Sequence, residues 1–162
     1  AFAPRVEREP ERVFFDVEDL GRLYPNGEAA VAQAVQAQAA RLGLEARVAI
    51  AGGKGTARVA TRARELGVVP AGAGGARAFL AAVPVELLTP DAELRAAFRR
   101  WGTRAGAQVA ALPPDAVAMR LGAPGARVCR LARGEETDDD EPFVPQLSED
   151  ALEEAIERDY RV

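Results

Sequence analysis

Between residues 12 and 70 the sequence alternates strand-like and helix-like segments, and this alternation limits the fold more than any other feature. Short apolar strand patterns cover residues 12–17, 47–51 and 68–70. One helix is predicted from an N-cap at Asn26 to Gly43, and a second over residues 54–66, closed by Gly67. This order predicts an α+β fold with helices packed on a sheet. Three strands are few for two long helices, so we expect at least one more strand upstream of the chain.

The character of the sequence changes at Pro84, where strand patterns stop. Four short helices are predicted at residues 91–101, 105–112, 115–121 and 125–133, separated by glycine or proline. The glycine-rich segment 71–76 before them is predicted to be a flexible connector. We therefore expect one domain over residues 1–82, a small helical domain over 83–134, and a tail over 135–162.

The charge is divided unevenly along the chain. Residues 1–134 carry a formal charge of +6, and residues 135–162 carry −10, so the net charge is −4. A basic body favours nucleic-acid contact and an acidic tail favours a solvated or partner-facing segment. A plain acidic linker that keeps the protein in solution is the alternative. Residues 135–141 are expected not to pack, and residues 150–159 to form a weak helix.

Some classes of site and location are disfavoured by composition. One cysteine, Cys129, and no histidine rule out a disulfide framework and a Cys/His zinc site, so we expect a reducing compartment and no metal or other cofactor. No run approaches the roughly 20 apolar residues of a membrane span, so no membrane contact is expected.

Glycines surround Lys54 in the segment AIAGGKGTA, residues 49–57. A nucleotide-binding phosphate loop needs a glycine six positions before the lysine and a hydroxyl residue after it. Val48 and Gly55 stand there, so the ATPase interpretation fails. Glycines between a strand and a helix can still hold a phosphate, whereas a tight turn that needs glycine is the simpler alternative.

The short helices around Gly102 are typical of a helix-hairpin-helix, which binds the nucleic-acid backbone without reading its sequence. Three arginines, Arg99, Arg100 and Arg104, cluster there. They are candidate phosphate contacts; a solvated basic face is the alternative.

Together these segments resemble the second half of the catalytic core of Y-family DNA polymerases, from the late palm through the thumb. The palm-like segments read RVFFDVEDLGRLYPNGEA and VAIAGGKGTARVATRA, and the thumb-like ones FLAAVPVELL and RRWGTRAGAQVAALP. The resemblance implies a partial ferredoxin-like palm (β-α-β-α-β), then an all-helical thumb with a helix-hairpin-helix. The tail would lead toward a little-finger domain that this chain lacks. Lys54 matches a triphosphate-contacting lysine of the family, and Arg58 follows it as a further nucleic-acid-binding candidate.

The catalytic carboxylates of the family are not matched. Active members carry Ser-Ile-Asp-Glu where this chain has EPER, so Glu11 and Arg12 occupy the positions of the two acids, on what we expect to be one strand. Two magnesium ions need converging carboxylates, and a guanidinium repels them. The first thumb hairpin also departs, because Thr89-Pro90-Asp91 replaces Gly-Ile-Gly.

With these departures the chain resembles the catalytically inactive Y-family homologues of the bacterial mutasome, the ImuB-type proteins. The resemblance implies a non-catalytic scaffold in damage-induced mutagenesis, cytoplasmic and nucleoid-associated, that binds DNA weakly and without sequence preference. Its implied partners are a RecA-like protein, an error-prone replicative-type polymerase and the sliding clamp, mostly through regions beyond this chain. An active translesion polymerase and an unrelated α/β binding module with a helical appendage are the alternatives.

Overall fold

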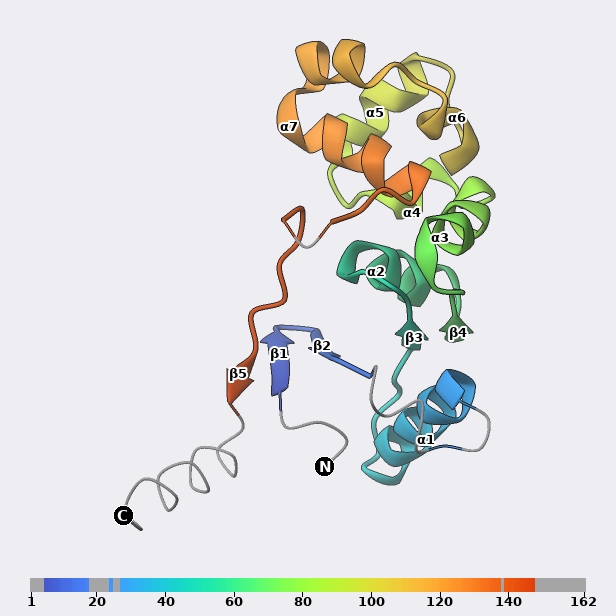
Figure 1. The fold of residues 1–162 in the computed structure, drawn as a ribbon, viewed down its shortest axis with the longest axis vertical. Helices are drawn as coiled ribbons and strands as arrows, with labels where there is room; N and C mark the ends of the chain where they lie inside the picture. Colours follow the sequence, from blue (N-terminus) through green and yellow to red (C-terminus); the bar gives the residue numbers. More distant parts are fainter. Residues whose placement is uncertain (1–4, 18–23, 25–26, 138, 148–162) are drawn as a thin grey trace.

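The structure, a computed structural model, describes residues 5–17, 24, 27–137 and 139–147. These residues form seven helices and two small sheets, so the chain is a mixed α+β protein (Figure 1). The strands are β1 (Arg5–Glu9), β2 (Arg12–Phe15), β3 (Val48–Ile50), β4 (Leu66–Val68) and β5 (Gln146–Leu147). The helices are α1 (Gly27–Arg41), α2 (Lys54–Ala63), α3 (Gly72–Ala81), α4 (Val85–Leu88), α5 (Ala92–Arg100), α6 (Gly106–Ala110) and α7 (Pro114–Arg133).

The strands divide between two sheets. Strands β1 and β2 form an antiparallel hairpin in which Glu9 pairs with Arg12, and β5 joins the other edge of β1. Strands β3 and β4 pair in parallel, connected through α2. The order β2-α1-β3-α2-β4 agrees with the predicted alternation, but no single sheet contains all three strands. A ferredoxin-like palm is therefore not confirmed.

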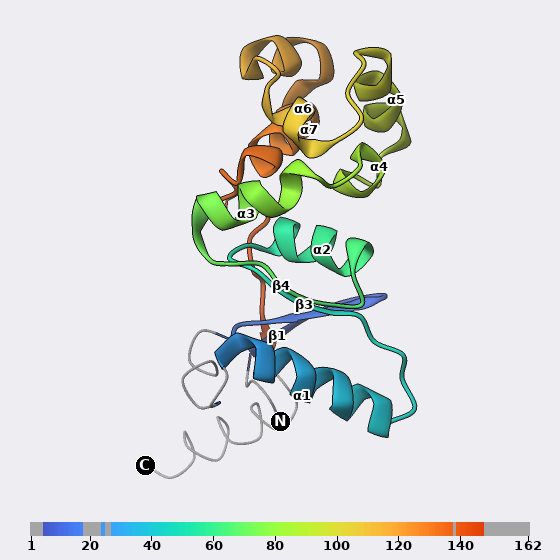
Figure 2. The same ribbon diagram turned by 90° about the vertical axis from the view of Figure 1, so that its right-hand side faces the viewer.

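Helices α1 and α2 lie on opposite sides of the β3–β4 pair (Figure 2). A small core forms on the α1 side, where Val31, Ala32 and Ile50 are buried. The prediction that α1 ends at Gly43 agrees with the left-handed backbone of that glycine, at φ +76°. The predicted N-cap, Asn26, lies outside the described residues.

The larger core lies among the helices that follow β4. Phe98, Leu80, Val85, Val109 and Cys129 are all buried there, and Val59 reaches it from α2. Residues from both sides of position 83 therefore share one core. The predicted break at residues 122–124 corresponds to a kink in α7 at Gly122, whose backbone is non-helical.

The expectation for the glycine-rich segment is wrong. The segment 71–76 is not a flexible connector, because from Gly72 onward it belongs to α3. Gly134 and Gly75 let this helix approach other backbone closely: an added Cβ on Gly134 would lie 2.9 Å from Arg77 N, and one on Gly75 would lie 2.8 Å from the carbonyl carbon of Pro70. Glycine here serves close packing.

The acidic segment 135–141 was expected not to pack, yet its described residues contact the body. Asp140 is buried and pairs with Arg130, and two glutamates of the segment bind residues of α2. Paired carboxylates offset the cost of ordering this segment. The helix predicted at 150–159 lies outside the described residues. Within the described ranges, no helix combines the length and apolarity that a membrane crossing requires.

Candidate functional site

The first turn of α2 binds a carboxylate of the protein's own tail. Gly53 is the N-cap of α2 and offers no side chain to the free backbone amides that begin a helix. Glu136 takes this role: its carboxylate accepts hydrogen bonds from Gly55 N, from Thr56 N at 3.0 Å and from Thr56 Oγ1 at 2.9 Å. The positive end of the helix dipole also favours an anion here.

The glycines of the segment leave room for this carboxylate. An added Cβ on Gly53 would lie 2.6 Å from Glu136 Oε2, and one on Gly55 would lie 3.2 Å from Glu136 Cδ. The glycine-rich segment therefore surrounds the carboxylate of an internal glutamate.

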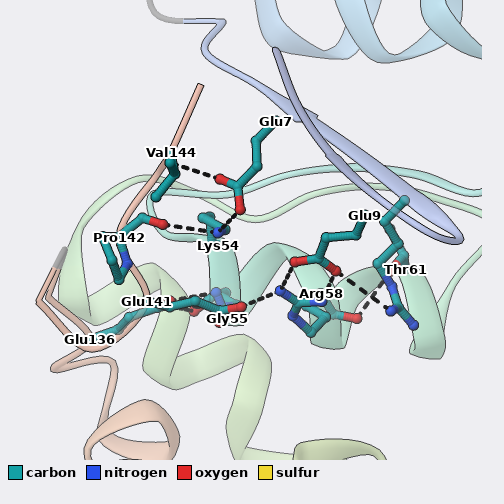
Figure 3. A network of polar contacts seen from close by, with 12 residues as sticks. Glu7, Glu9, Lys54, Gly55, Arg58, Thr61, Glu136, Glu141, Pro142 and Val144 are labelled. Atoms are coloured by element: carbon teal, nitrogen blue, oxygen red, sulfur yellow. Dashed lines mark hydrogen bonds and ion pairs between the residues drawn. The ribbon is translucent and has the colours of Figure 1, made fainter. Parts of the chain in front are cut away.

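Lys54 points toward the hairpin and the tail (Figure 3). Its Nζ donates to Glu7 Oε1 of β1 at 2.7 Å and to the carbonyl oxygen of Pro142 at 3.0 Å. The other oxygen of Glu7 accepts from Val144 N at 2.8 Å. Glu7 thus ties β1 both to α2 and to the tail.

Arg58, one helical turn further along α2, forms the second half of the network (Figure 3). Its guanidinium binds both carboxylate oxygens of Glu9, at 2.6 and 2.8 Å, and also pairs with Glu141. The ring of Phe14 lies 4.9 Å from the Arg58 guanidinium and 5.1 Å from Lys54 Nζ. Both cations are largely shielded from solvent, with side-chain exposures of 12% for Lys54 and 16% for Arg58.

The network shifts the acid–base properties of its members. The hydrogen bonds from Arg58 hold the pKa of Glu9 below its ordinary value, although burial opposes the shift. Burial also tends to raise the pKa of Glu7, but hydrogen bonds from Lys54 and Val144 N outweigh it and lower that pKa. The pKa of Arg58 is raised mainly by its bonds to Glu9.

These shifts predict loss of stability in acid. A carboxylate with a depressed folded-state pKa stabilises the fold fully above its unfolded value, 4.5 for Glu7 and Glu9, and loses this contribution as pH falls through the folded value. We expect the thermal midpoint to fall between about pH 7 and about pH 3, and to fall less in a Glu7→Gln/Glu9→Gln variant. An equal fall in both proteins would contradict the role of these two acids.

Glu11 and Arg12, the positions matched to the family's catalytic acids, do not lie together on a strand as expected. Glu11 occupies the exposed turn between β1 and β2, after Pro10, and only Arg12 belongs to β2. Arg12 faces Glu9 across the hairpin, 4.0 Å from its carboxylate. In the part of the chain that the structure describes, no group of three or more acidic, cysteine or histidine side chains is arranged to hold a metal.

The predicted arginine cluster lies around the turn from α5 to α6. Arg99 pairs with Glu86 of α4, with Nε 2.7 Å from the carboxylate. Arg100 and Arg104 are exposed, and their guanidinium groups form no ion pair within the described ranges. At the first thumb-like hairpin, Asp91 caps α5 by accepting from Glu93 N and Leu94 N, so its carboxylate occupies those amides.

Of the predicted nucleic-acid-binding residues, Lys54 and Arg58 lie together on α2. The other three, Arg99, Arg100 and Arg104, lie apart from them, at α5 and the turn that follows it (Figure 1). The partners of Lys54 and Arg58 were missed from the sequence. Glu7 and Glu9 lie on a strand with one apolar residue, and Glu136 and Glu141 lie in a charge run. The sequence signal that could have indicated such pairs is the charge division, because the tail contains twelve acidic residues and residues 1–134 carry a net positive charge.

Comparison with known proteins finds no relative: no protein-family model matches the chain, and no curated protein or solved structure is significantly similar.

Proposed function

We propose that the protein is a non-catalytic, Y-family polymerase-like scaffold that contacts DNA during damage-induced mutagenesis. The observation that carries the proposal is the internal closure of the α2 site. Lys54, which matches the family's triphosphate-contacting lysine, is bound by Glu7 and Pro142, and Glu136 fills the adjacent helix terminus. A triphosphate would have to displace two carboxylates before it could bind.

The positions of the family's two catalytic acids support the same proposal. Metal-assisted phosphoryl transfer depends on carboxylates that hold two divalent ions close to the reacting phosphate. Glu11 is alone in an exposed turn, and Arg12 adds a permanent positive charge beside it. This electrostatic arrangement opposes metal binding, so we favour a scaffold over an active translesion polymerase.

In this proposal the exposed arginines of the helical part contact the DNA backbone. Arg100 and Arg104 form no ion pair with an acid among the residues that the structure describes, whereas Arg99 pairs with Glu86. Contacts of this type carry no base information, and their strength falls with added salt because counterions are released on binding.

A double charge reversal tests the DNA-contact surface. Arg100→Glu/Arg104→Glu should weaken binding to a duplex oligonucleotide by about tenfold or more at low salt, because two phosphate contacts become repulsive. Fluorescence anisotropy over a salt series measures both the affinity and its slope against salt.

Arg41→Glu/Arg47→Glu is the matched control, since both arginines are exposed near the end of α1 and the change in net charge is the same. We expect a much smaller loss in this control. Equal losses in the two variants would show that net charge alone governs binding, and no loss in either would exclude this surface.

A further inference from the structure

Four arginines of β2, α2 and α5 lie either at the carboxylate of Glu9 or at backbone carbonyls near the end of α4. Arg58 and Arg62 lie one turn apart on α2, Arg12 shares Glu9 with Arg58, and Arg95 extends from α5. Arg62 donates to Leu87 O at 3.2 Å, and Arg95 donates to Thr89 O at 3.3 Å. Both guanidinium groups are therefore held at the segment that links α4 to α5.

This cluster carries more positive than negative charge. Glu9 and Glu141 are the carboxylates that pair with it in the described structure, and Arg62 and Arg95 bind only backbone carbonyls. Burial lowers the pKa of Arg62, and the charges of Arg12, Arg58 and Arg95 lower it further, whereas the charge of Glu141 raises it. Neighbouring positive charges repel one another, and a nearby anion reduces this repulsion. Glu141, which pairs with Arg58, supplies one negative charge.

Glu141 belongs to a segment held at several points, which we call the strap and define as residues 136–137 and 139–144. Glu136 binds the first turn of α2, Asp140 pairs with Arg130, Pro142 O accepts from Lys54, and Val144 N donates to Glu7. The strap crosses from the end of α7 toward the β1–β2 hairpin along α2 (Figures 1 and 3). Most of these contacts are ionic or charge-assisted, so salt and competing anions weaken them.

We propose that the strap is an autoinhibitory contact: Glu141 and Glu136 hold it over the arginine cluster, and its release exposes a second surface for the phosphate backbone of nucleic acid. Guanidinium groups bind phosphate in the same forked geometry as carboxylate, so Glu141 occupies a position that a backbone phosphate can take. This inference rests on the proposed function, since it adds a gated surface to the exposed one at Arg100 and Arg104.

Strap release is tested with Glu136→Gln/Glu141→Gln, which removes two charges and keeps the side-chain shapes. Binding to a duplex oligonucleotide, measured by fluorescence anisotropy at about 50 mM salt, should tighten by about tenfold. Glu135→Gln/Asp139→Asn is the matched control, because both residues are exposed, neither forms an ion pair in the described structure, and the charge change is the same. A gain of less than about twofold is expected there.

A third variant locates the added binding. Arg12→Gln/Arg62→Gln, introduced into the released protein, should return the affinity to the wild-type value. Amide exchange provides the structural readout: the Thr56 N–H, which donates to Glu136, should exchange faster in the released protein while Val109 in the core stays protected. Glu141→Gln alone leaves Glu136 at the start of α2 unchanged and should also tighten DNA binding relative to the wild type.

The outcomes separate this inference from the proposed function. Equal affinities for the released protein and its control overturn the strap, even if the wild type binds DNA through Arg100 and Arg104. An increase that survives Arg12→Gln/Arg62→Gln also overturns it. Absence of DNA binding in every variant overturns the proposed DNA contact itself.

Discussion

Gly75→Ala should destabilise the protein by about 2–3 kcal/mol, the range expected when a methyl group is forced into a packed contact. Gly75 lies in α3, and its missing side chain lets the helix pack against the end of the preceding loop. An added Cβ would lie 2.8 Å from the carbonyl carbon and 2.9 Å from Cβ of Pro70, so backbone must move to admit it. Chemical denaturation followed by tryptophan fluorescence measures the loss.

The neighbouring residue, Gly74, provides the control. It lies in the same helix, is exposed, and an added Cβ there meets no atom within 4 Å. Alanine should therefore stabilise α3 by about 0.5–1 kcal/mol through its higher helix propensity. If the two substitutions had the same effect, the close approach of α3 to Pro70 would be contradicted.

Phe98→Ala should cost more, about 3–5 kcal/mol, because it removes a large buried ring and leaves a cavity. Phe98 is fully buried at the centre of the helical core, and its ring meets Trp101 edge-on at 5.9 Å between centroids. Thr103 also donates its hydroxyl hydrogen to the carbonyl oxygen of Phe98, at 2.7 Å, so the same residue anchors the turn before α6. This bond uses the backbone carbonyl, which alanine keeps, so the loss of stability should come from the ring itself.

Trp101 is the single tryptophan of the chain, so its fluorescence reports directly on this core. Met119→Ala on α7 is the comparison: the side chain is 83% exposed, and a change within about 0.5 kcal/mol is expected. A small effect of Phe98→Ala would mean that the core forms without this ring.

Helices and strands could be predicted from the sequence where the apolar periodicity agrees with the positions of capping residues, glycine and proline. The helix predicted over residues 91–101 corresponds to α5, Ala92–Arg100, and Asp91 is its N-cap. The glycines of α3 were wrongly predicted to form a flexible connector. Glycine occurs both in flexible segments and where two backbones pack closely, and only the position of the neighbouring backbone distinguishes the two cases. Strand β1 was missed because four of its five residues are charged, and its pairing with β2 gives it order that its composition does not indicate.

The candidate site was only half predictable. Glycines and a lysine at a helix start suggested a place for a phosphate, with a tight turn as the alternative; in the structure the carboxylate of Glu136 lies there, 80 residues away from Thr56. Pairs at such separation depend on the path of the chain and leave no local pattern. Lys54 and Arg58 were selected as nucleic-acid contacts, and the structure gives both of them internal acids, so Arg100 and Arg104 keep that role in the proposal.

From the proposed function we expect the α2 site and the Glu11–Arg12 position to carry no nucleotidyl-transfer chemistry. Primer extension by the protein on damaged and undamaged templates, with magnesium and all four deoxynucleotides, tests this expectation. We expect no extension, because Arg12 opposes the metal ions, Glu7 and Glu141 pair with Lys54 and Arg58, and Glu136 occupies the backbone amides at the start of α2. Magnesium-dependent extension that disappears in a Glu11→Ala/Arg12→Ala variant would contradict the account and identify an active polymerase.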